Sequence, residues 1–211
     1  MTALDRHELV DELDRRAGTA QRLLVAIAGP PGSGKSTLAE WLRDRLNERR
    51  AQLAEILAMD GFHYDDRVLE AAGERARKGA PHTFDVDGLA ATLERLHRND
   101  GRDVAVPVFD REIEIARAGA RIIRAGVRIV VVEGNYLLLD DPAWAPLRRF
   151  FAMTVMLDVP EPVLEARLTQ RWLGFGYGPD ALRDKMEGND MPNVRLVQGH
   201  SVPADYTVGE R

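Results

Sequence analysis

The chain has 211 residues, of which 45% are hydrophobic and 30% charged, which predicts one compact domain spanning residues 1–211. Its formal net charge of -5 argues against a nucleic-acid partner that binds a basic surface. The sequence has no cysteine, a charged N-terminal stretch and only short apolar runs, so we expect a cytoplasmic protein that does not enter membranes and has no disulfides.

Helical and strand patterns alternate along the chain. Residues 3–16 place Leu9, Val10 and Leu13 among charged residues, which predicts an amphipathic helix. The continuous apolar run over residues 23–28 predicts a strand buried on both faces, and a helical pattern follows it. Further apolar runs predict strands at residues 53–59, 104–108, 129–132, 154–157 and 206–208. This alternation predicts an α/β fold with a mostly parallel sheet and helices on both faces.

Polar residues follow most of these predicted strands. They are the loop at residues 29–36, Asp60, Asp110 with Arg111, Glu133 and Asp158. Ligands of open parallel sheets bind at the carboxyl ends of the strands. We therefore expect these residues to form one site.

Residues 29–36 match the phosphate-binding motif G-x-x-x-x-G-K-[ST], between a predicted strand and a predicted helix. The glycines let backbone N–H groups turn toward phosphate oxygens, while Lys35 bridges the β- and γ-phosphates and the Ser36 hydroxyl ligates Mg²⁺. ATP and Mg²⁺ are the expected cofactors. No Asn-Lys-x-Asp guanine motif occurs, which disfavours a Ras-like GTPase. The predicted nucleotide-binding residues are Gly29, Pro30, Pro31, Gly32, Ser33, Gly34, Lys35, Ser36 and Thr37.

Two carboxylates at strand ends are candidates for the chemistry. Glu133 is expected to hold Mg²⁺ together with Ser36, or to contact the acceptor; the alternative is an ordinary strand-end carboxylate. Asp60 can accept the proton of an attacking hydroxyl, with a turn-forming role before Gly61 as the alternative. The aromatic residues that follow are expected to line the acceptor pocket: Phe62, His63 and Tyr64.

Residues 161–190 have the pattern of a small lid. A helix is predicted from Pro162 to Trp172, and Arg167 and Arg171 lie four residues apart on one stripe of it. Three glycines after this helix would give a hinge. Closure would bring both guanidinium groups to the transferred phosphate and exclude water. The alternative is a solvated helix face with surface ion pairs.

The chain resembles the P-loop kinase family that groups uridine kinase, phosphoribulokinase and the bacterial type of pantothenate kinase. Residues 29–36 match its opening motif, residues 59–62 (Met-Asp-Gly-Phe) look like the segment with its catalytic base, and residues 132–134 (Val-Glu-Gly) look like its glutamate-ended strand. Residues 78–85 and 107–111 look like its acceptor-side segments.

This resemblance implies a three-layer P-loop NTPase fold with a small lid. It implies that the catalytic residues are Asp60, Lys35, Arg167 and Arg171. It also implies acceptor binding by Phe84, Asp85, Arg111 and Glu133, in addition to the aromatic residues after Asp60. The pair Ala204-Asp205 looks like the pair that leads into the family's strand beside the adenine.

These motifs are closest to those of pantothenate kinase, but the chain as a whole looks more like the small bacterial kinases of this family labelled sugar kinase or fructokinase. The chain is shorter than pantothenate kinases. It also lacks the Asp-Ser-Phe motif that uridine kinases and phosphoribulokinases commonly have at the catalytic base. We predict transfer of the γ-phosphate of ATP to a hydroxyl of a small metabolite, with a sugar such as fructose as the first candidate. The alternatives are a uridine-like nucleoside or pantothenate as the acceptor, or a nucleotide-dependent switch or assembly ATPase. A homodimer is left open.

Overall fold

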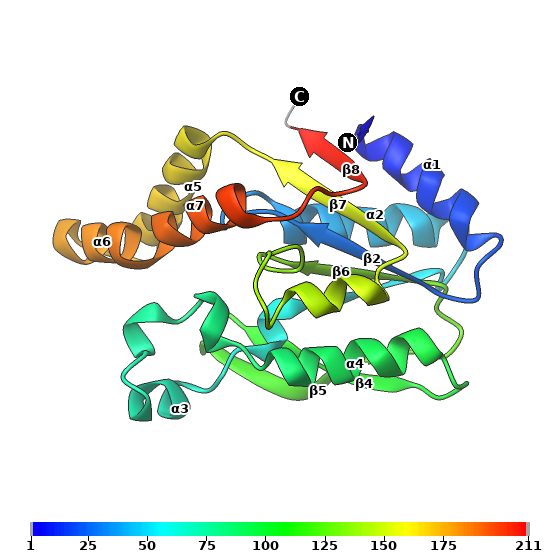
Figure 1. Ribbon diagram of the computed structural model, residues 1–211, viewed down its shortest axis with the longest axis horizontal. Coiled ribbons are helices and arrows are strands. Elements are labelled where there is room, and N and C mark those ends of the chain that lie inside the picture. Colours follow the sequence, from blue (N-terminus) through cyan, green and yellow to red (C-terminus); the bar gives the residue numbers. More distant parts are fainter. Residues whose placement is uncertain (1, 210–211) are drawn as a thin grey trace.

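The computed structural model describes residues 2–209; of the predicted domain, Met1, Glu210 and Arg211 lie outside the described residues. Two sheets are present (Figure 1), a six-stranded sheet in the order β1-β8-β7-β2-β6-β3 and a two-stranded sheet of β4 and β5. The strands are β1 (Thr2–Ala3), β2 (Leu23–Ala28), β3 (Ala54–Ala58), β4 (Val104–Asp110), β5 (Ile115–Ile123), β6 (Ile129–Gly134), β7 (Met153–Asp158) and β8 (Tyr206–Gly209). The α-helices are α1 (Arg6–Ala17), α2 (Lys35–Arg49), α3 (Asp66–Ala71), α4 (Val86–Arg98), α5 (Glu161–Gly174), α6 (Pro179–Lys185) and α7 (Met191–His200).

Every strand pairing in the six-stranded sheet is parallel. This confirms the predicted α/β class, and five of the six predicted strands form in this sheet within one or two residues of their expected bounds. β2 lies between β6 and β7 and is parallel to both. The loop after β2 and the residue Glu133 near the end of β6 therefore lie together at the carboxyl ends of the strands. The sheet thereby places the phosphate-binding motif at its centre.

Each face of the main sheet is covered by its own apolar cluster, which makes three layers. Leu24 and Ala26 of β2 belong to the cluster with α4 and the β4–β5 hairpin, while Val25 and Ile27 belong to the cluster with α1 and α2. Figure 1 shows α1 and α2 on one side of the sheet and α4 with the hairpin on the other. β2 is therefore buried on both faces, as its continuous apolar run predicted.

The strand expected at residues 104–108 forms, but it does not join the main sheet, and this expectation is corrected. β4 pairs antiparallel with β5, a strand that the sequence analysis did not predict. Most residues of β5 are exposed, and Arg and Gly interrupt its apolar residues, so no apolar run indicates it. Arg111 consequently reaches the site from a hairpin turn and not from the end of a parallel strand.

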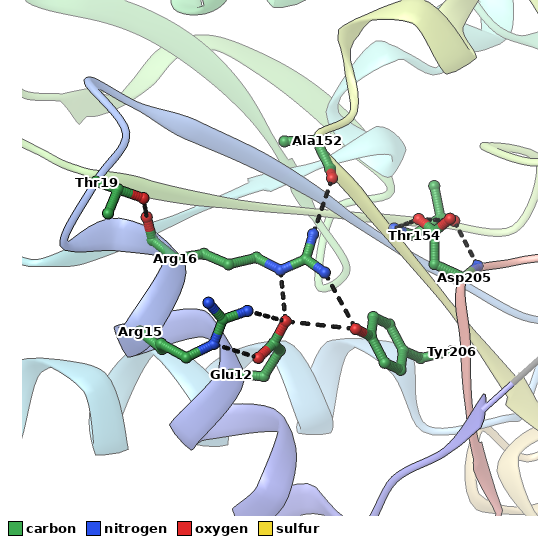
Figure 2. A network of polar contacts seen from close by, with 8 residues as sticks. All are labelled: Glu12, Arg15, Arg16, Thr19, Ala152, Thr154, Asp205 and Tyr206. Carbon is green, nitrogen blue, oxygen red and sulfur yellow. Dashed lines mark hydrogen bonds and ion pairs between the residues drawn. The ribbon is translucent and has the colours of Figure 1, made fainter.

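α1 is hydrogen-bonded to β8 through the polar network shown in Figure 2. Glu12 accepts hydrogen bonds from Arg15 and Arg16, and Arg16 also donates to the hydroxyl of Tyr206 at 3.0 Å. Asp205 accepts hydrogen bonds from the backbone N–H and the hydroxyl of Thr154, both at 2.8 Å. Asp205 thus fixes the start of β8 against the start of β7, at the edge opposite the phosphate-binding loop.

Residues 161–200 form what we name the helical arm, which comprises α5, α6, a π-helix (Met186–Asp190) and α7. In Figure 1 the main strands point toward the end of the molecule where this arm and α3 extend. The arm has its own apolar cluster, which includes Leu164, Leu168 and Val194. Within residues 2–209, no helix is both long and apolar enough to cross a membrane.

Candidate active site

The phosphate-binding loop, residues 29–37, joins β2 to α2. Gly34 has φ 89°, a left-handed conformation that side-chain-bearing residues rarely adopt. No side chain caps α2, so the N–H groups of its first turn are available to an anion. The loop therefore has the backbone that a triphosphate requires.

Lys35 lies buried inside this loop, with 8% of its surface exposed. Its Nζ donates to the carbonyl of Pro30 at 3.0 Å and to the hydroxyl of Ser33 at 3.5 Å. Burial lowers the pKa of Lys35 to about 8, although Glu133 and Asp60 nearby favour the charged form. A buried ammonium group beside an uncapped helix start fits the phosphates of ATP.

Ser36 and Glu133 bring two oxygen atoms together beside the phosphate-binding loop, and both are candidate metal ligands. The Ser36 hydroxyl donates to Glu133 Oε1 at 3.1 Å. Burial raises the pKa of Glu133 to about 7, and the charge of Asp60 adds to this effect, while Lys35 and Ser36 oppose it. No cluster of three or more metal-ligating side chains occurs among residues 2–209. The pair fits Mg²⁺, because this ion keeps few protein ligands and takes the rest from phosphates and water.

Asp60 lies on a 3-10 helix, Met59–Phe62, directly after β3. Gly61 makes the close approach of β4 feasible, since a Cβ there would lie 2.6 Å from the carbonyl oxygen of Pro107. Asp60 Oδ2 pairs with Arg111 Nη2 at 2.6 Å, whereas no described residue donates to Oδ1. Burial disfavours the charged carboxylate, but His63, Arg111 and Lys35 outweigh it and lower the pKa of Asp60. At neutral pH Asp60 is an ionised group with one oxygen available to accept a proton.

His63 is the aromatic residue held closest to Asp60. Its Nδ1 lies 2.8 Å from the backbone carbonyl oxygen of Asp60, and its ring centre lies 4.0 Å from that of Phe84 and 4.8 Å from that of Phe109. Burial lowers the pKa of His63, although Asp60 opposes this effect. The imidazole is thereby fixed in orientation beside the candidate base.

The other aromatic residues predicted to bind the acceptor, and Asp85, make contacts in the fold that do not by themselves indicate acceptor binding. Phe62 and Phe84 are buried in the apolar cluster beneath His63, and Tyr64 is 38% exposed. Asp85 caps α4 by accepting a hydrogen bond from the N–H of Gly88 at 2.8 Å. The structure gives Phe62 and Phe84 packing roles and Asp85 a capping role, and the expected contacts with an acceptor stay predictions.

Arg167 and Arg171 both project from α5, which forms as predicted. Arg167 Nη1 donates to the carbonyl of Gly32 in the phosphate-binding loop at 3.4 Å. Arg171 has no ion pair with any described carboxylate. Burial lowers the pKa of Arg171, and the like charge of Arg111 acts in the same direction. An unpaired guanidinium near other cations is suited to a phosphate.

The sequence analysis missed several polar residues around this site. The buried Lys78 donates from Nζ to Asp66 at 2.6 Å and to the carbonyl of Glu114 in the hairpin turn at 2.8 Å. Tyr136 donates from its hydroxyl to the carbonyl of Gly79 at 2.6 Å. One signal was available, because the only lysines in this arginine-rich chain are Lys35, Lys78 and Lys185.

The fold and the phosphate-binding loop define the class: a P-loop protein of the nucleotide-binding kinases. The chain belongs to the phosphoribulokinase / uridine kinase family, whose model matches residues 24–195. It is therefore an ATP-dependent kinase of small molecules, and the resemblance found in the sequence is confirmed.

Three relatives show how close this likeness is. A Schizosaccharomyces pombe protein named "Putative uridine kinase C227.14" is 34% identical, over 94% of this chain and 89% of its own. The "Uncharacterized protein YggC" of Escherichia coli is 34% identical, over 89% of this chain and 78% of its own. The crystal structure of a "putative fructose transport system kinase" from Silicibacter sp. TM1040 is 41% identical, with a TM-score of 0.89, and covers 97% of this chain and 99% of that one. The fold is thus the one predicted.

Proposed function

We propose that this kinase transfers the γ-phosphate of ATP to a hydroxyl of a small polar metabolite, with a sugar such as fructose as the first candidate acceptor. The observation that supports this most is the convergence of the Asp60 carboxylate with Lys35 and Glu133 at one edge of the sheet. The 41% identical relative described as a fructose transport system kinase supports a sugar.

The residues then have distinct roles. Asp60 orients the acceptor hydroxyl and accepts its proton as the new oxygen–phosphorus bond forms and the bond to the leaving phosphate breaks. Lys35 and the loop N–H groups hold the triphosphate, and Ser36 and Glu133 hold Mg²⁺, which neutralises phosphate charge when bound. Arg111 holds one oxygen of Asp60, which keeps the other directed to the acceptor.

Residues 161–190 act as a lid in this proposal. Arg171 neutralises the transferred group, and Arg167 holds α5 to the phosphate-binding loop through Gly32. Closure excludes water, which limits hydrolysis of ATP. The homodimer stays open, and the cytoplasmic location and the single domain stay predictions.

A nucleoside is the second candidate acceptor, because the S. pombe relative is named as a uridine kinase. Pantothenate rests on the resemblance of the motifs to those of pantothenate kinase, at residues 78–85, 107–111 and 132–134. The switch or assembly ATPase loses support, since the family and the relatives named above are described by kinase activities or left uncharacterised.

The test measures ATP consumption with Mg²⁺ across sugars, polyols, nucleosides and pantothenate, with the product mass confirming phosphorylation. Asp60→Asn should retain ATP binding and lose about 10²–10⁴-fold in transfer rate, because the general base is removed. Asp65→Asn is the matched control, since Asp65 caps α3 and asparagine also caps helices. Full turnover by Asp60→Asn would reject the role of Asp60, and a panel without any phosphorylated product would reject the proposed acceptor classes.

A further inference from the structure

A five-residue π-helix, Met186–Asp190, joins α6 to α7 in the helical arm. Such turns are rare and are frequent at functional sites. Two of its polar side chains are buried, Asn189 with 2% and Asp190 with 7% of their surface exposed. The proposed transfer step uses neither of them. Because buried polar groups are nearly always hydrogen-bonded, their partners show what this turn holds in place.

Asn189 binds the 78–85 loop. Its Nδ2 donates to the backbone carbonyl of Lys78 at 3.0 Å. One turn further along α7, Asn193 Nδ2 lies 3.5 Å from the carbonyl oxygen of Gly79 and donates to Asn189 Oδ1 at 3.2 Å. The two amides thus form one buried unit that holds two consecutive residues of the loop.

Arg77 makes a third bond between the same two segments, from the opposite side. Its Nη1 donates to the carbonyl of Gly188 within the π-helix. The arm is therefore bonded to three successive residues, Arg77 and the first two residues of the loop, through donors from both segments. The Arg77 bond is exposed, whereas the bonds that Asn189 makes to Lys78 and to Asn193 are buried. The buried bonds resist separation, because each broken one leaves a buried polar atom unpaired.

Lys78 and Gly79 are also hydrogen-bonded to segments on the side of the candidate base, Asp60. The Tyr136 hydroxyl, on the segment after β6, donates to the carbonyl of Gly79 at 2.6 Å. Lys78 Nζ donates to the carbonyl of Glu114, in the hairpin turn that also contains Arg111. Since Arg111 pairs with Asp60, a displacement of this stretch is passed to the group that holds the base.

On the arm, the π-helix is joined to the helix with the two arginines. Asp190 Oδ2 accepts a hydrogen bond from Trp172 Nε1 at 2.6 Å, and Trp172 directly follows Arg171 on α5. Lys185 Nζ lies 3.9 Å from Asp190 Oδ1 and 5.0 Å from the centre of the Trp172 ring. The turn therefore has α5 and α6 on one side and the loop on the other.

We propose that Asn189 is a positioning residue that couples the helical arm to the 78–85 loop, so that an acceptor held by the loop stabilises the arm in the arrangement that places Arg171 on the transferred phosphate. The consequence of this coupling rests on the proposed function. A bound acceptor favours phosphate transfer over hydrolysis of ATP, because it holds the arm in this arrangement. By linkage, nucleotide bound beside the arm orders the loop in return.

The first test measures how the enzyme partitions ATP, with an acceptor from the panel. Asn189→Ala should raise the acceptor KM and the fraction of ATP hydrolysed without transfer by about tenfold each, within the about 5–150-fold range of such couplings, and leave ATP binding unchanged. Arg77→Met should act in the same direction, because it breaks the link from the loop side while leaving the arm intact.

Gln198→Ala is the matched control. Gln198 lies on α7, in the same helical arm as Asn189, and also donates from a side-chain amide to a backbone carbonyl, that of Val159 at 3.1 Å, but it does not touch the loop. A merely structural role for Asn189 would lower the melting temperature without changing the partition of ATP. Unchanged partition in folded Asn189→Ala and Arg77→Met proteins would overturn the proposal.

A second test needs no acceptor. Hydrogen exchange is followed at the amides of Lys78, Gly79, Ala80 and Thr83, all of which are hydrogen-bonded within the loop region. A non-hydrolysable ATP analogue should slow their exchange several-fold in the wild type and in Gln198→Ala, and not in Asn189→Ala or Arg77→Met. Equal slowing in all four proteins would reject the coupling even if no acceptor is found, whereas an empty acceptor panel alone would count against the proposed function.

Discussion

Glu133 combines burial with ionisation, which makes the stability of the nucleotide-free protein depend on pH. Burial raises its pKa from 4.5 to about 7, and the negative charge of Asp60 contributes in the same direction. The folded state therefore binds a proton more tightly than the unfolded state does. Stability rises as pH falls from about 7 toward 4.5, and above pH 7 the buried charge destabilises the fold at its full cost.

Glu133→Gln should remove this cost while keeping the volume of the side chain. Without nucleotide or Mg²⁺, we expect its melting temperature at pH 8 to exceed that of the wild type by about 2–8 °C, and the difference to shrink toward zero near pH 4.5. Calorimetric scans over this pH range provide the check. Glu94→Gln, at an exposed pair on α4, is the control, and an equal or lower melting temperature for Glu133→Gln at pH 8 would contradict the prediction.

Residues that act within one short segment could be predicted from the sequence, and residues that act across segments could not. Lys35 and Ser36 could be proposed as site residues because eight consecutive residues define their loop. Asp60 could be proposed because its strand and the following Gly61 are local features. Asn189 could not, since its role depends on a loop 111 residues away in the sequence.

At the scale of elements, α1 illustrates stabilisation by a partly buried network at the surface. Asp5 caps this helix together with Glu8, and Glu12 joins it to Tyr206 of β8 (Figure 2). Hydrogen bonds from Arg15 and Arg16 lower the pKa of Glu12 from 4.5 to about 2. Because the folded pKa is depressed, this stabilisation is present above pH 4.5 and is lost as the pH falls toward 2.

Glu12→Gln should therefore lower the melting temperature at pH 7 by about 2–4 °C, which corresponds to about 1 kcal/mol for a partly buried ion pair in a protein of this size. In urea titrations, the stability difference from the wild type should decrease steadily between pH 4.5 and pH 3. Glu40→Gln should change nothing, because Glu40 on α2 is exposed and has no ion pair with any residue in 2–209. A difference that stayed constant with pH would show that the charge of Glu12 is not responsible.

Elements with one continuous apolar run were predicted well, and the hairpin was not. β2 and β6 are buried on both faces, so their sequences are apolar throughout. β5 packs mainly through Ile123 and otherwise lies exposed, so its sequence contains no run that separates it from a loop. Its pairing with β4 depends on tertiary packing, and Arg111 and Glu114 enter the site only through that pairing.

For the molecule as a whole, Mg²⁺ and nucleotide should stabilise the fold together. A non-hydrolysable ATP analogue at 100-fold its Kd contributes about 2.7 kcal/mol, or roughly 5–10 °C in melting temperature. With Ser36→Ala, the increment that depends on Mg²⁺ should disappear, while the analogue alone still stabilises the protein. Thermal melts with analogue plus Mg²⁺ or plus EDTA separate the two contributions. Persistence of the Mg²⁺ increment in Ser36→Ala would reject Ser36 as a ligand.

The strand order β1-β8-β7-β2-β6-β3 also governs how the chain emerges from the ribosome. β2 is synthesised early, yet both of its partners, β6 and β7, follow only after α2, α4 and the hairpin have been made. At a synthesis rate of about 5–20 residues per second, the backbone of the run Leu23–Ala28 stays without its strand partners for several seconds. This apolar segment is thus the part of the nascent chain that most needs a chaperone, and the step that ends its exposure is the arrival of β6.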